Sequence, residues 1–315
     1  MNKITTKYSD LINGYLFILP ACLIISLFGI FPVFFAMYMS FHKWKVFKGR
    51  FWGFENYQRI LGDISSFWLF IFGLLIMIFS YWFWTEYKNK IQNIYLILSI
   101  SIISLIISLI IINYSWASMM EKGDDDFLYS LIYVFYYSFF AITIEVGLGL
   151  LIAYALYQKI KGKQFFQMIL LFPYITPAVM GGAVFFIIFG RAENSLLNEF
   201  IGFFGFEPQL WLFDKRTLSE ILFGIKIKGF FAGPSLALTT SIIYGVWSYT
   251  GYYAIILLAG LSMIPSDLYE AAKAEGASRW QTFTKITIPL LMPIIFFLLL
   301  TGFINSFQAF NHILV

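Results

Sequence analysis

The sequence is poor in charged residues and has little that could serve as a catalytic centre. Only 12% of its 315 residues are charged and 60% are hydrophobic, whereas about a quarter of the residues of soluble globular chains are charged. One cysteine, Cys22, and two histidines, His42 and His312, are present, which excludes a disulfide framework and a metal cluster built on thiols or imidazoles. The composition excludes a soluble domain and indicates helices surrounded by lipid.

Signatures of enzymes and of nucleic-acid binding are also missing. No H-E-x-x-H motif occurs, and Gly162-Lys163 lacks the preceding glycine and the following Ser or Thr of a phosphate-binding loop. The net charge of +4 is small and the basic residues are scattered, so no basic stripe for nucleic acid is present. We therefore expect a protein that is not an enzyme, has no catalytic residue or metal ligand, binds no nucleic acid and cannot hydrolyse ATP itself.

Long apolar runs fill most of the sequence. Those long enough to cross about 30 Å of hydrocarbon as helices are 14–41, 67–84, 94–112, 127–156, 165–189, 236–263 and 286–310. The first run would be about 40 Å long as a helix, too long for a cleavable signal peptide, so we expect it to remain. The sequence predicts an all-α integral membrane protein, a polytopic helical bundle of about seven transmembrane helices in a single domain, 1–315.

The distribution of lysine and arginine does not decide the orientation of the chain. With a cytoplasmic N-terminus, ten of the 21 basic residues lie in cytoplasmic segments and eleven lie on the other side, so the excess that the positive-inside rule requires is absent. The segment after the first span opposes the rule most strongly, through Lys43, Lys45, Lys48, Arg50 and Arg59. The orientation must therefore come from a motif.

The segment between the last two spans, 264–285, is typical of a short helix with a defined end. Its alanines favour helix, a glutamate complements the positive N-terminal dipole, and a glycine permits the chain to turn out. The residues concerned are Glu270, Ala271, Ala272 and Gly276, followed after nine further residues by Ile286 and then by Pro289. A short helix held between two spans can be gripped by a groove on a partner protein.

This spacing, E-A-A, three residues, G, nine residues and I-x-[LI]-P, resembles the cytoplasmic loop of importer-type ABC permeases. In that family the loop is a coupling helix that docks in a cleft of a separate ATPase subunit. The resemblance implies this role for Glu270, Ala271, Ala272, Gly276 and Pro289, and it places the loop and the N-terminus in the cytoplasm. The alternative is an amphipathic connector in which E-A-A occurs by chance.

Further segments resemble the carbohydrate-uptake branch of the family, the maltose and glycerol-phosphate type of permease. They are 17–20, 31–32, 40–41, 53–57, 171–177, 246–251 and 259–265. The chain departs from that branch by an inserted two-helix hairpin at 67–112 and by a longer outer loop, where 218–231 is expected to lie at the membrane interface. It also lacks the branch's final helix after Val315, which makes it either a fragment or a chain with a divergent end.

The resemblance implies a permease subunit of an ATP-driven, binding-protein-dependent importer that moves a sugar or oligosaccharide into the cell. The implied partners are a second, similar permease, two ATPase subunits that bind ATP and Mg, an extracytoplasmic sugar-binding protein and membrane lipid; no cofactor is expected in this chain. The implied location is the bacterial plasma (inner) membrane, with several passes and a cytoplasmic N-terminus. Because the E-A-A loop says nothing about cargo, glycerol phosphate, a polyol or a polyamine are alternative substrates.

A sugar path needs aromatic faces and hydrogen-bonding groups, and the last two spans offer both. By resemblance, the sugar-contacting positions of the maltose permease fall at Gly245, Ser248, Tyr249, Tyr252, Gly302, Asn305, Ser306 and Ala309. The residue types match that permease only in part. For each position, packing between helices is the alternative role.

Glu145 lies in the middle of an apolar run, where an ionised carboxylate costs about 2.5–3.5 kcal/mol. It must be protonated, paired or facing water, and we favour a polar contact between helices. The rival hypothesis is an ion-coupled secondary transporter, or a sensor subunit, with Glu145 as its charged centre, although no internal repeat supports it. The pairs Pro173/Pro177 and Pro289/Pro293 are expected to bend their helices, beside a pore or merely within a packed bundle.

Overall fold

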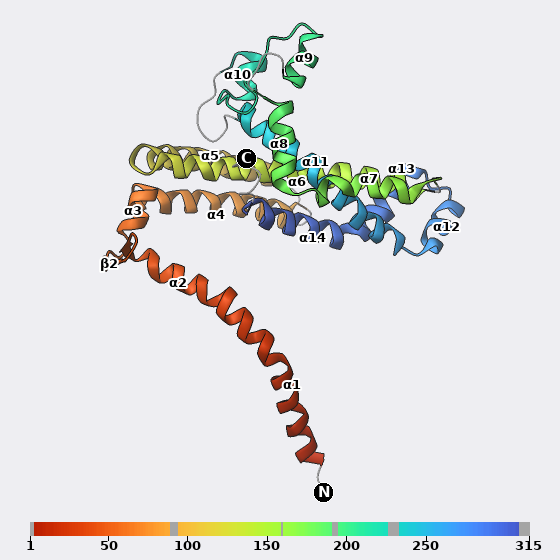
Figure 1. Cartoon of the computed structure of the whole chain (residues 1–315), viewed down its shortest axis with the longest axis horizontal. Coiled ribbons are helices and arrows are strands. Elements are labelled where there is room, and N and C mark those ends of the chain that lie inside the picture. The colour runs from red at the N-terminus through yellow and green to blue at the C-terminus, as the bar shows by residue number, and fades with distance from the viewer. Residues whose placement is uncertain (1–2, 89–93, 159, 191–194, 226–232, 309–315) are drawn as a thin grey trace. The chain divides into compact units, whose positions relative to one another are not determined.

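The computed structural model describes residues 3–88, 94–158, 160–190, 195–225 and 233–308. Within them the regular elements are helices apart from one short β-hairpin and an isolated bridge, and turns and irregular loops connect them (Figure 1). It divides into two compact units, Met1–Leu128 and Tyr129–Val315. The expected all-α polytopic membrane fold is confirmed, whereas the single domain over 1–315 stays a prediction.

Unit 1 begins with a long apolar helix that is interrupted by a π-turn. The elements of this unit are α1 (Lys3–Ile25), the π-turn η1 (Ser26–Ile30), α2 (Phe31–Ser40), β1 (His42–Trp44), β2 (Lys48–Phe51), α3 (Glu55–Leu61), α4 (Ile64–Tyr87) and α5 (Ile94–Lys122). The π-turn directly precedes Pro32, which has no backbone N–H to donate to the turn before it. The stretch Ile12–Ser40 is long and apolar enough to span a membrane.

Helices α4 and α5 form the two-helix hairpin of unit 1 and lie side by side (Figure 1). Small residues recur every seven positions along the buried face of each helix, at Ser66, Gly73 and Ser80 in α4 and at Ser101, Ser108 and Ser115 in α5. The Ser80 hydroxyl donates to the Ser101 carbonyl at 2.6 Å, and a Cβ on Gly73 would lie 2.8 Å from Ile112 Cγ1. Small side chains therefore let the two backbones approach closely, as is common in membranes.

This antiparallel register predicts a specific cross-link. The hydroxyls of Ser66 and Ser118 are 2.9 Å apart, so Ser66→Cys with Ser118→Cys, in a chain carrying Cys22→Ser, should oxidise to a disulfide in membranes. Mass spectrometry after alkylation should find both thiols lost. The matched control is Ser65→Cys with Ser118→Cys, because Ser65 is exposed; equal cross-linking of the two pairs would contradict the register.

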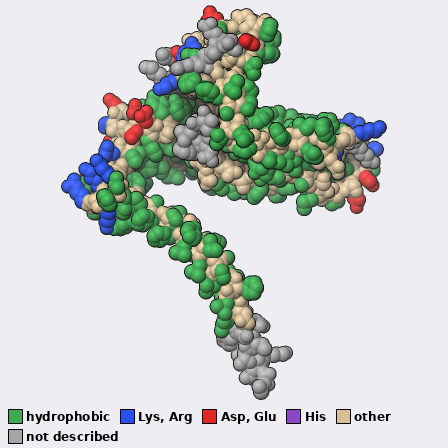
Figure 2. Space-filling view, viewed as in Figure 1, with side chains coloured by type: hydrophobic (Ala, Val, Ile, Leu, Met, Phe, Trp, Pro, Cys, Tyr) green, Lys and Arg blue, Asp and Glu red, His purple; other side chains and the backbone are tan. Residues whose placement is uncertain are grey.

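Unit 2 contains the remaining spans and the loops between them. Its elements are α6 (Asp125–Tyr157, which begins in unit 1), α7 (Lys163–Ile175), α8 (Ala178–Ile188), α9 (Leu196–Gly202), α10 (Leu218–Phe223), α11 (Leu236–Ser262), α12 (Ser266–Ala274), α13 (Arg279–Thr282), the π-turn η3 (Phe283–Thr287) and α14 (Ile288–Ser306). Most of the apolar side chains of the outer helices are exposed (Figure 2), as expected for surfaces that meet lipid or other subunits.

Helix α11 is central to unit 2, and 56% of its most apolar stretch is buried. It packs with α6 and α14 around a core that includes Ile142, Leu257, Leu261 and Leu298. The described residues contain six helices long and apolar enough to span a membrane, and they correspond to six of the seven predicted runs.

The seventh run, 165–189, is not a single straight helix but a broken span or a re-entrant loop. It forms α7 and α8, whose axes are bent by 91° at the break. Thr176 is extended because the ring of Pro177 disfavours the helical conformation in the residue before it. The expected bend is therefore present at Pro177, as a full break, whereas Pro173 lies inside α7. Of the segment 218–231, only the part up to residue 225, which includes α10, lies within the described residues.

Candidate functional site

The centre of unit 2 holds a buried carboxyl group surrounded by tyrosines. Glu145 of α6 is 4% exposed, and Tyr137 and Tyr253 beside it are buried as well. The Tyr253 hydroxyl donates a hydrogen bond to the Glu145 carboxyl group. The cluster links α6 to α11, so Glu145 makes the contact between helices that a buried acid in an apolar bundle requires.

Two glycines make room for this cluster, and both are predicted substrate-path residues. A Cβ on Gly245 would lie 2.5 Å from the Tyr137 hydroxyl and 3.4 Å from Glu145 Oε1. A Cβ on Gly302 of α14 would collide with the Tyr253 hydroxyl. These glycines therefore serve, at the least, as spacers that let the tyrosine hydroxyls reach the middle of the bundle.

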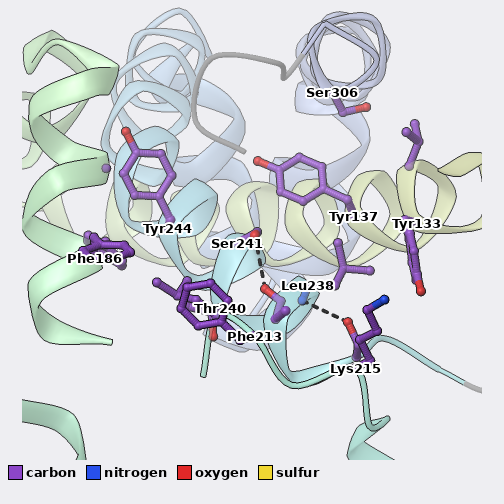
Figure 3. A pocket seen from close by; sticks show the side chains of 16 residues that line it. Tyr133, Tyr137, Phe186, Phe213, Lys215, Leu238, Thr240, Ser241, Tyr244 and Ser306 are labelled. Carbon is purple, nitrogen blue, oxygen red and sulfur yellow. Dashed lines mark hydrogen bonds between the residues drawn. The ribbon is translucent and has the colours of Figure 1, made fainter. Parts of the chain in front are cut away.

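Two cavities of very different size meet beside the cluster. The small one, about 30 Å³, is lined by Tyr137, Ala141, Ile142, Glu145, Tyr249, Tyr253, Gly302, Asn305 and Ser306. The large one, about 650 Å³, lies among α6, α8, α11 and the segment 212–215, with Tyr133, Tyr137 and Tyr244 around it and Lys215 at its edge (Figure 3). Tyr137 and Ser306 line both cavities. A hydrogen bond of 2.5 Å between the Ser138 and Ser306 hydroxyls joins α6 to α14 at this point.

The structure brings most of the predicted path residues to this region. Tyr249, Gly302, Asn305 and Ser306 line the small cavity, and Gly245 adjoins it. Ser248 is buried in α11.

The other two predicted path residues are placed differently. Tyr252 stacks on Tyr174 of α7, with ring centroids 4.5 Å apart, and does not line either cavity. Ala309 lies outside the described residues.

Sequence reasoning missed the tyrosines that complete the cluster, Tyr137 and Tyr253. One signal was available: Ser138 and Glu145 are seven residues apart and so lie on one face of α6, which marks a polar stripe in an apolar helix. The pairing of that stripe with Tyr253 of α11 had no signal in the sequence, because it depends on how the helices pack.

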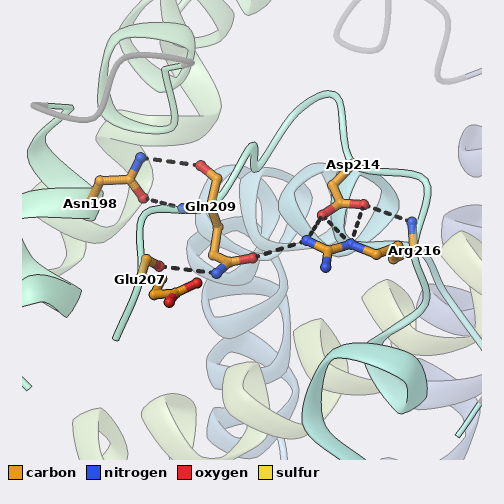
Figure 4. Close-up of polar contacts among 5 residues, drawn as sticks. All are labelled: Asn198, Glu207, Gln209, Asp214 and Arg216. Atoms are coloured by element: carbon orange, nitrogen blue, oxygen red, sulfur yellow. Dashed lines mark hydrogen bonds and ion pairs between the residues drawn. The ribbon is translucent and has the colours of Figure 1, made fainter. Parts of the chain in front are cut away.

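The loop between α8 and α11 is held by a polar network (Figure 4). The buried Asn198 side chain accepts from the Gln209 backbone N–H at 3.0 Å and from Trp211 Nε1 at 2.8 Å. Arg216 donates to both carboxylate oxygens of Asp214, at 2.6 and 2.9 Å to Oδ2 and 3.1 Å to Oδ1.

Hydrogen bonds from Arg216 hold the pKa of Asp214 below its usual value. The stabilisation that this pair contributes is therefore present at neutral pH and lost as the pH falls through that lowered pKa. The network fixes the segment 212–215 that lines one side of the large cavity.

The predicted coupling segment forms α12, and the chain leaves it as expected at Gly276, whose φ is 76°. The Ala277 N–H closes the turn on the Ala272 carbonyl at 2.9 Å. Pro289 stands in the first turn of α14, directly after the π-turn η3, so both π-turns of the chain's described part precede a proline.

One face of α12 packs against the protein. Ala272 is buried, and the Tyr269 hydroxyl lies 3.2 Å from Thr287 Oγ1. The rings of Tyr269 and Tyr157, at the end of α6, are 6.4 Å apart. Partial burial raises the pKa of Tyr269, so the hydroxyl remains protonated and available for this hydrogen bond. Helix α12 is thereby connected to the ends of α6 and α14.

The opposite face of α12 is exposed. Glu270 and Ala271 are exposed, as are Leu268 and, after the helix, Trp280, whose side chain is 72% exposed. Exposed apolar side chains beside charged ones are typical of a surface that meets another protein. The structure therefore presents the motif in a form that a partner could bind.

The packing of α7 against α11 can be tested at Gly251, where the two backbones approach closely. A Cβ on Gly251 would collide with the Leu170 backbone carbonyl, which cannot move aside as a flexible side chain could. Gly251→Ala should therefore destabilise the protein by about 1–3 kcal/mol, measured as a lower thermal unfolding midpoint in detergent. The control is Gly147→Ala, where nothing lies within 4 Å; equal midpoints for the two variants would contradict the packing.

Comparison with known proteins identifies the family. Residues 145–314 match the family described as "Binding-protein-dependent transport system inner membrane component". This range is more than half of the chain, and it includes Glu145, α11, α12 and α14. The chain belongs to this family of membrane transport permeases.

Among its relatives, the chain is 26% identical over its whole length to the trehalose/maltose transport system permease protein MalF of Thermococcus litoralis, of which it covers 80%. It is 31% identical, over 56% of its length, to the arabinooligosaccharides transport system permease protein AraP of Bacillus subtilis, of which it covers 50%. A solved bacterial ABC transporter involved in the import of the acidic polysaccharide alginate aligns over 62% of both chains, with a TM-score of 0.48 and 19% identity.

Proposed function

We propose that this chain is a permease subunit of an ATP-driven, binding-protein-dependent importer that moves a sugar or oligosaccharide into the cell. The observation that carries the proposal is α12, a short helix with the E-A-A-x₃-G motif, packed on one face and exposed on the other. The substrate class rests on the names of the relatives, which are permeases for trehalose, maltose and arabinooligosaccharides.

The proposed function requires partner subunits, because this sequence has no phosphate-binding loop for ATP. ATP and Mg would be bound by two ATPase subunits that grip α12, and a second, similar permease would complete the membrane part. The N-terminus and α12 would lie in the cytoplasm of a bacterium, in its plasma membrane, so the loop that carries Asn198 and Arg216 would face an extracytoplasmic sugar-binding protein. This chain itself needs no cofactor.

The contacts of α12 suggest how closure of the ATPase subunits would reach the path. A displacement of α12 acts on α14 through Tyr269 and Thr287 and on the end of α6 through Tyr157. These two helices meet again at the Ser138–Ser306 hydrogen bond, between the two cavities. Movement of α12 would therefore part or close α6 and α14 at that constriction.

The cavities suggest which way this conformation is open. The large cavity is within the size range of ligand sites, about 300–1,000 Å³, and its aromatic rings suit the apolar faces of a sugar. The small cavity could hold about one water molecule, so no sugar passes between Tyr137 and Ser306 without rearrangement. A sugar delivered from the loop side would wait in the large cavity until α6 and α14 part.

The subunit composition is the first test of the proposal. The tagged full-length chain, purified from membranes in mild detergent, should bring down an ATPase and a second permease, identified by mass spectrometry. The ATPase activity of the eluate should rise with a sugar-loaded binding protein. A solitary chain without ATPase, with uptake driven by an ion gradient, would contradict the importer and indicate a secondary transporter.

Competition of uptake by unlabelled sugars, glycerol phosphate, polyols and polyamines identifies the substrate.

Substitutions in α12 test the coupling role. Two variants, Glu270→Ala and Gly276→Val, should each lower uptake at least about tenfold, which corresponds to a loss of roughly 1.4 kcal/mol of coupling free energy between ATPase and permease. Gly276 has a left-handed backbone conformation that valine disfavours. Membrane insertion should stay intact. The matched control is Glu275→Ala, which removes the same charge from an exposed neighbour; uptake equal to the wild type in all three variants would exclude α12 as the coupling helix.

A substitution of Asn305 tests the proposed sugar path. Its side chain lines the small cavity, where a passing sugar would need an amide for its hydroxyl groups. Asn305→Ala should raise the sugar concentration at half-maximal uptake about fivefold, the value of one hydrogen bond near 1 kcal/mol. Asn113→Ala, at an exposed position of α5, is the control. An unchanged half-maximal concentration for Asn305→Ala would remove this residue from the path.

A further inference from the structure

The β-hairpin that follows α2 carries a concentration of cations beside exposed apolar side chains. The cations are Lys43, Lys45, Lys48 and Arg50, and all four are exposed (Figure 2). At the tip, the side chains of Val46 and Phe47 are each 84% exposed. This is the segment whose charges oppose the positive-inside rule, and the transport function leaves it without a role.

The base of the hairpin is rigidly attached to the end of the first span. Asn56 Nδ2 donates to the carbonyls of Ser40 and His42, at 2.8 and 3.0 Å, and the Trp52 N–H donates to the Phe41 carbonyl at 2.8 Å. Gly49 is required within the hairpin, because a Cβ there would collide with the Lys43 carbonyl. The direction of the tip is thus fixed by the helix that enters it.

The cations of the hairpin have no ion pair with an acid among the described residues. Lys43 lies over the Trp52 ring and Lys48 over the Tyr38 ring, at 4.8 and 4.9 Å from the ring centroids. Among the residues that the structure describes, Lys45 and Arg50 have no carboxylate within ion-pair distance. Their charges are therefore available to an anionic ligand.

The position of the hairpin selects that ligand. The candidate span ends at Ser40, two residues before β1, so a strand of three or four residues keeps the tip within roughly 15 Å of the hydrocarbon edge. Aromatic rings, apolar tip residues and cations together are typical of a segment in the headgroup region of a bilayer. A lipid headgroup meets all three features, whereas a free phosphate ion would use the cations alone.

We propose that this hairpin is a binding site for anionic phospholipid headgroups, with Val46 and Phe47 inserted in the interface and Lys45 and Arg50 on lipid phosphates. The site holds the end of the first span at a fixed depth in the membrane. It is independent of the transported substrate.

A local fluorescent reporter tests the site. The full chain with Cys22→Ser and Val46→Cys, labelled with an environment-sensitive dye, is placed in nanodiscs whose lipid ranges from pure phosphatidylcholine to mixtures with phosphatidylglycerol. The dye emission should shift to the blue as the anionic lipid increases. It should return towards the phosphatidylcholine value at about 1 M salt, where charges are screened beyond about 3 Å.

Charge removal then assigns the effect to the hairpin. The single variant Lys45→Gln should need on the order of fivefold more anionic lipid to reach half of the emission shift, because one cation near such a surface usually contributes about that much to binding. The double variant Lys45→Gln with Arg50→Gln should abolish the shift. Lys161→Gln, which removes an exposed charge elsewhere, should leave it unchanged.

Four results would overturn the site. One is an emission that is the same in both lipids. Another is a blue emission that does not change when the hairpin charges are removed, which would leave apolar insertion alone. The third is a shift that appears with millimolar inorganic phosphate in phosphatidylcholine discs, since the occupant would then be free phosphate. The fourth is a shift that appears only after the partner subunits bind, since the occupant would then be a protein.

Discussion

A carboxyl group in the middle of an apolar helix must find polar partners, and this requirement determines how unit 2 is packed. The alternative, an unpartnered acid in an apolar interior, costs several kcal/mol. Glu145 is satisfied by Tyr253, with Tyr137 beside it, and these bulky residues reach it only because Gly245 and Gly302 leave space. The same small residues that admit the tyrosines leave the small cavity where α6, α11 and α14 meet. The helix packing and the small cavity are thus two results of one constraint.

Three of the prolines coincide with deviations of the membrane helices from regular geometry, whereas Pro20, Pro173 and Pro293 lie inside helices. Pro32 and Pro289 each follow a π-turn, and Pro177 separates two helices bent by 91°. In lipid, a backbone group without its helical partner must be satisfied by another part of the protein. Deviations of this kind are tolerated where other parts of the chain lie close, as at Thr287, which donates to the Thr282 carbonyl and contacts Tyr269.

The positions of the membrane spans could be predicted from the sequence, whereas the contacts between the spans could not. Apolar runs located six spans, because the bilayer imposes a length on any helix that crosses it. The seventh run is broken at Thr176–Pro177; its prolines predicted a bend, but a window of apolar residues cannot give the angle between the two helices. The motif around Glu270 was readable because it is local, whereas the pairing of Glu145 with Tyr253 joins residues 108 positions apart in the sequence and depends on tertiary packing.

The placement of the glycines limits when a sugar could reach two of the predicted path positions. Gly245 and Gly302 are occupied by contacts within the chain, so a sugar could touch them only after Tyr137 and Tyr253 withdraw. Withdrawal would expose Glu145, and a sugar hydroxyl could then replace the Tyr253 hydroxyl as its hydrogen-bond donor. On the proposed sugar path, the cost of moving the tyrosines would be offset by contacts that a polyhydroxylated substrate supplies, and the cluster would then act as a filter as well as a closure.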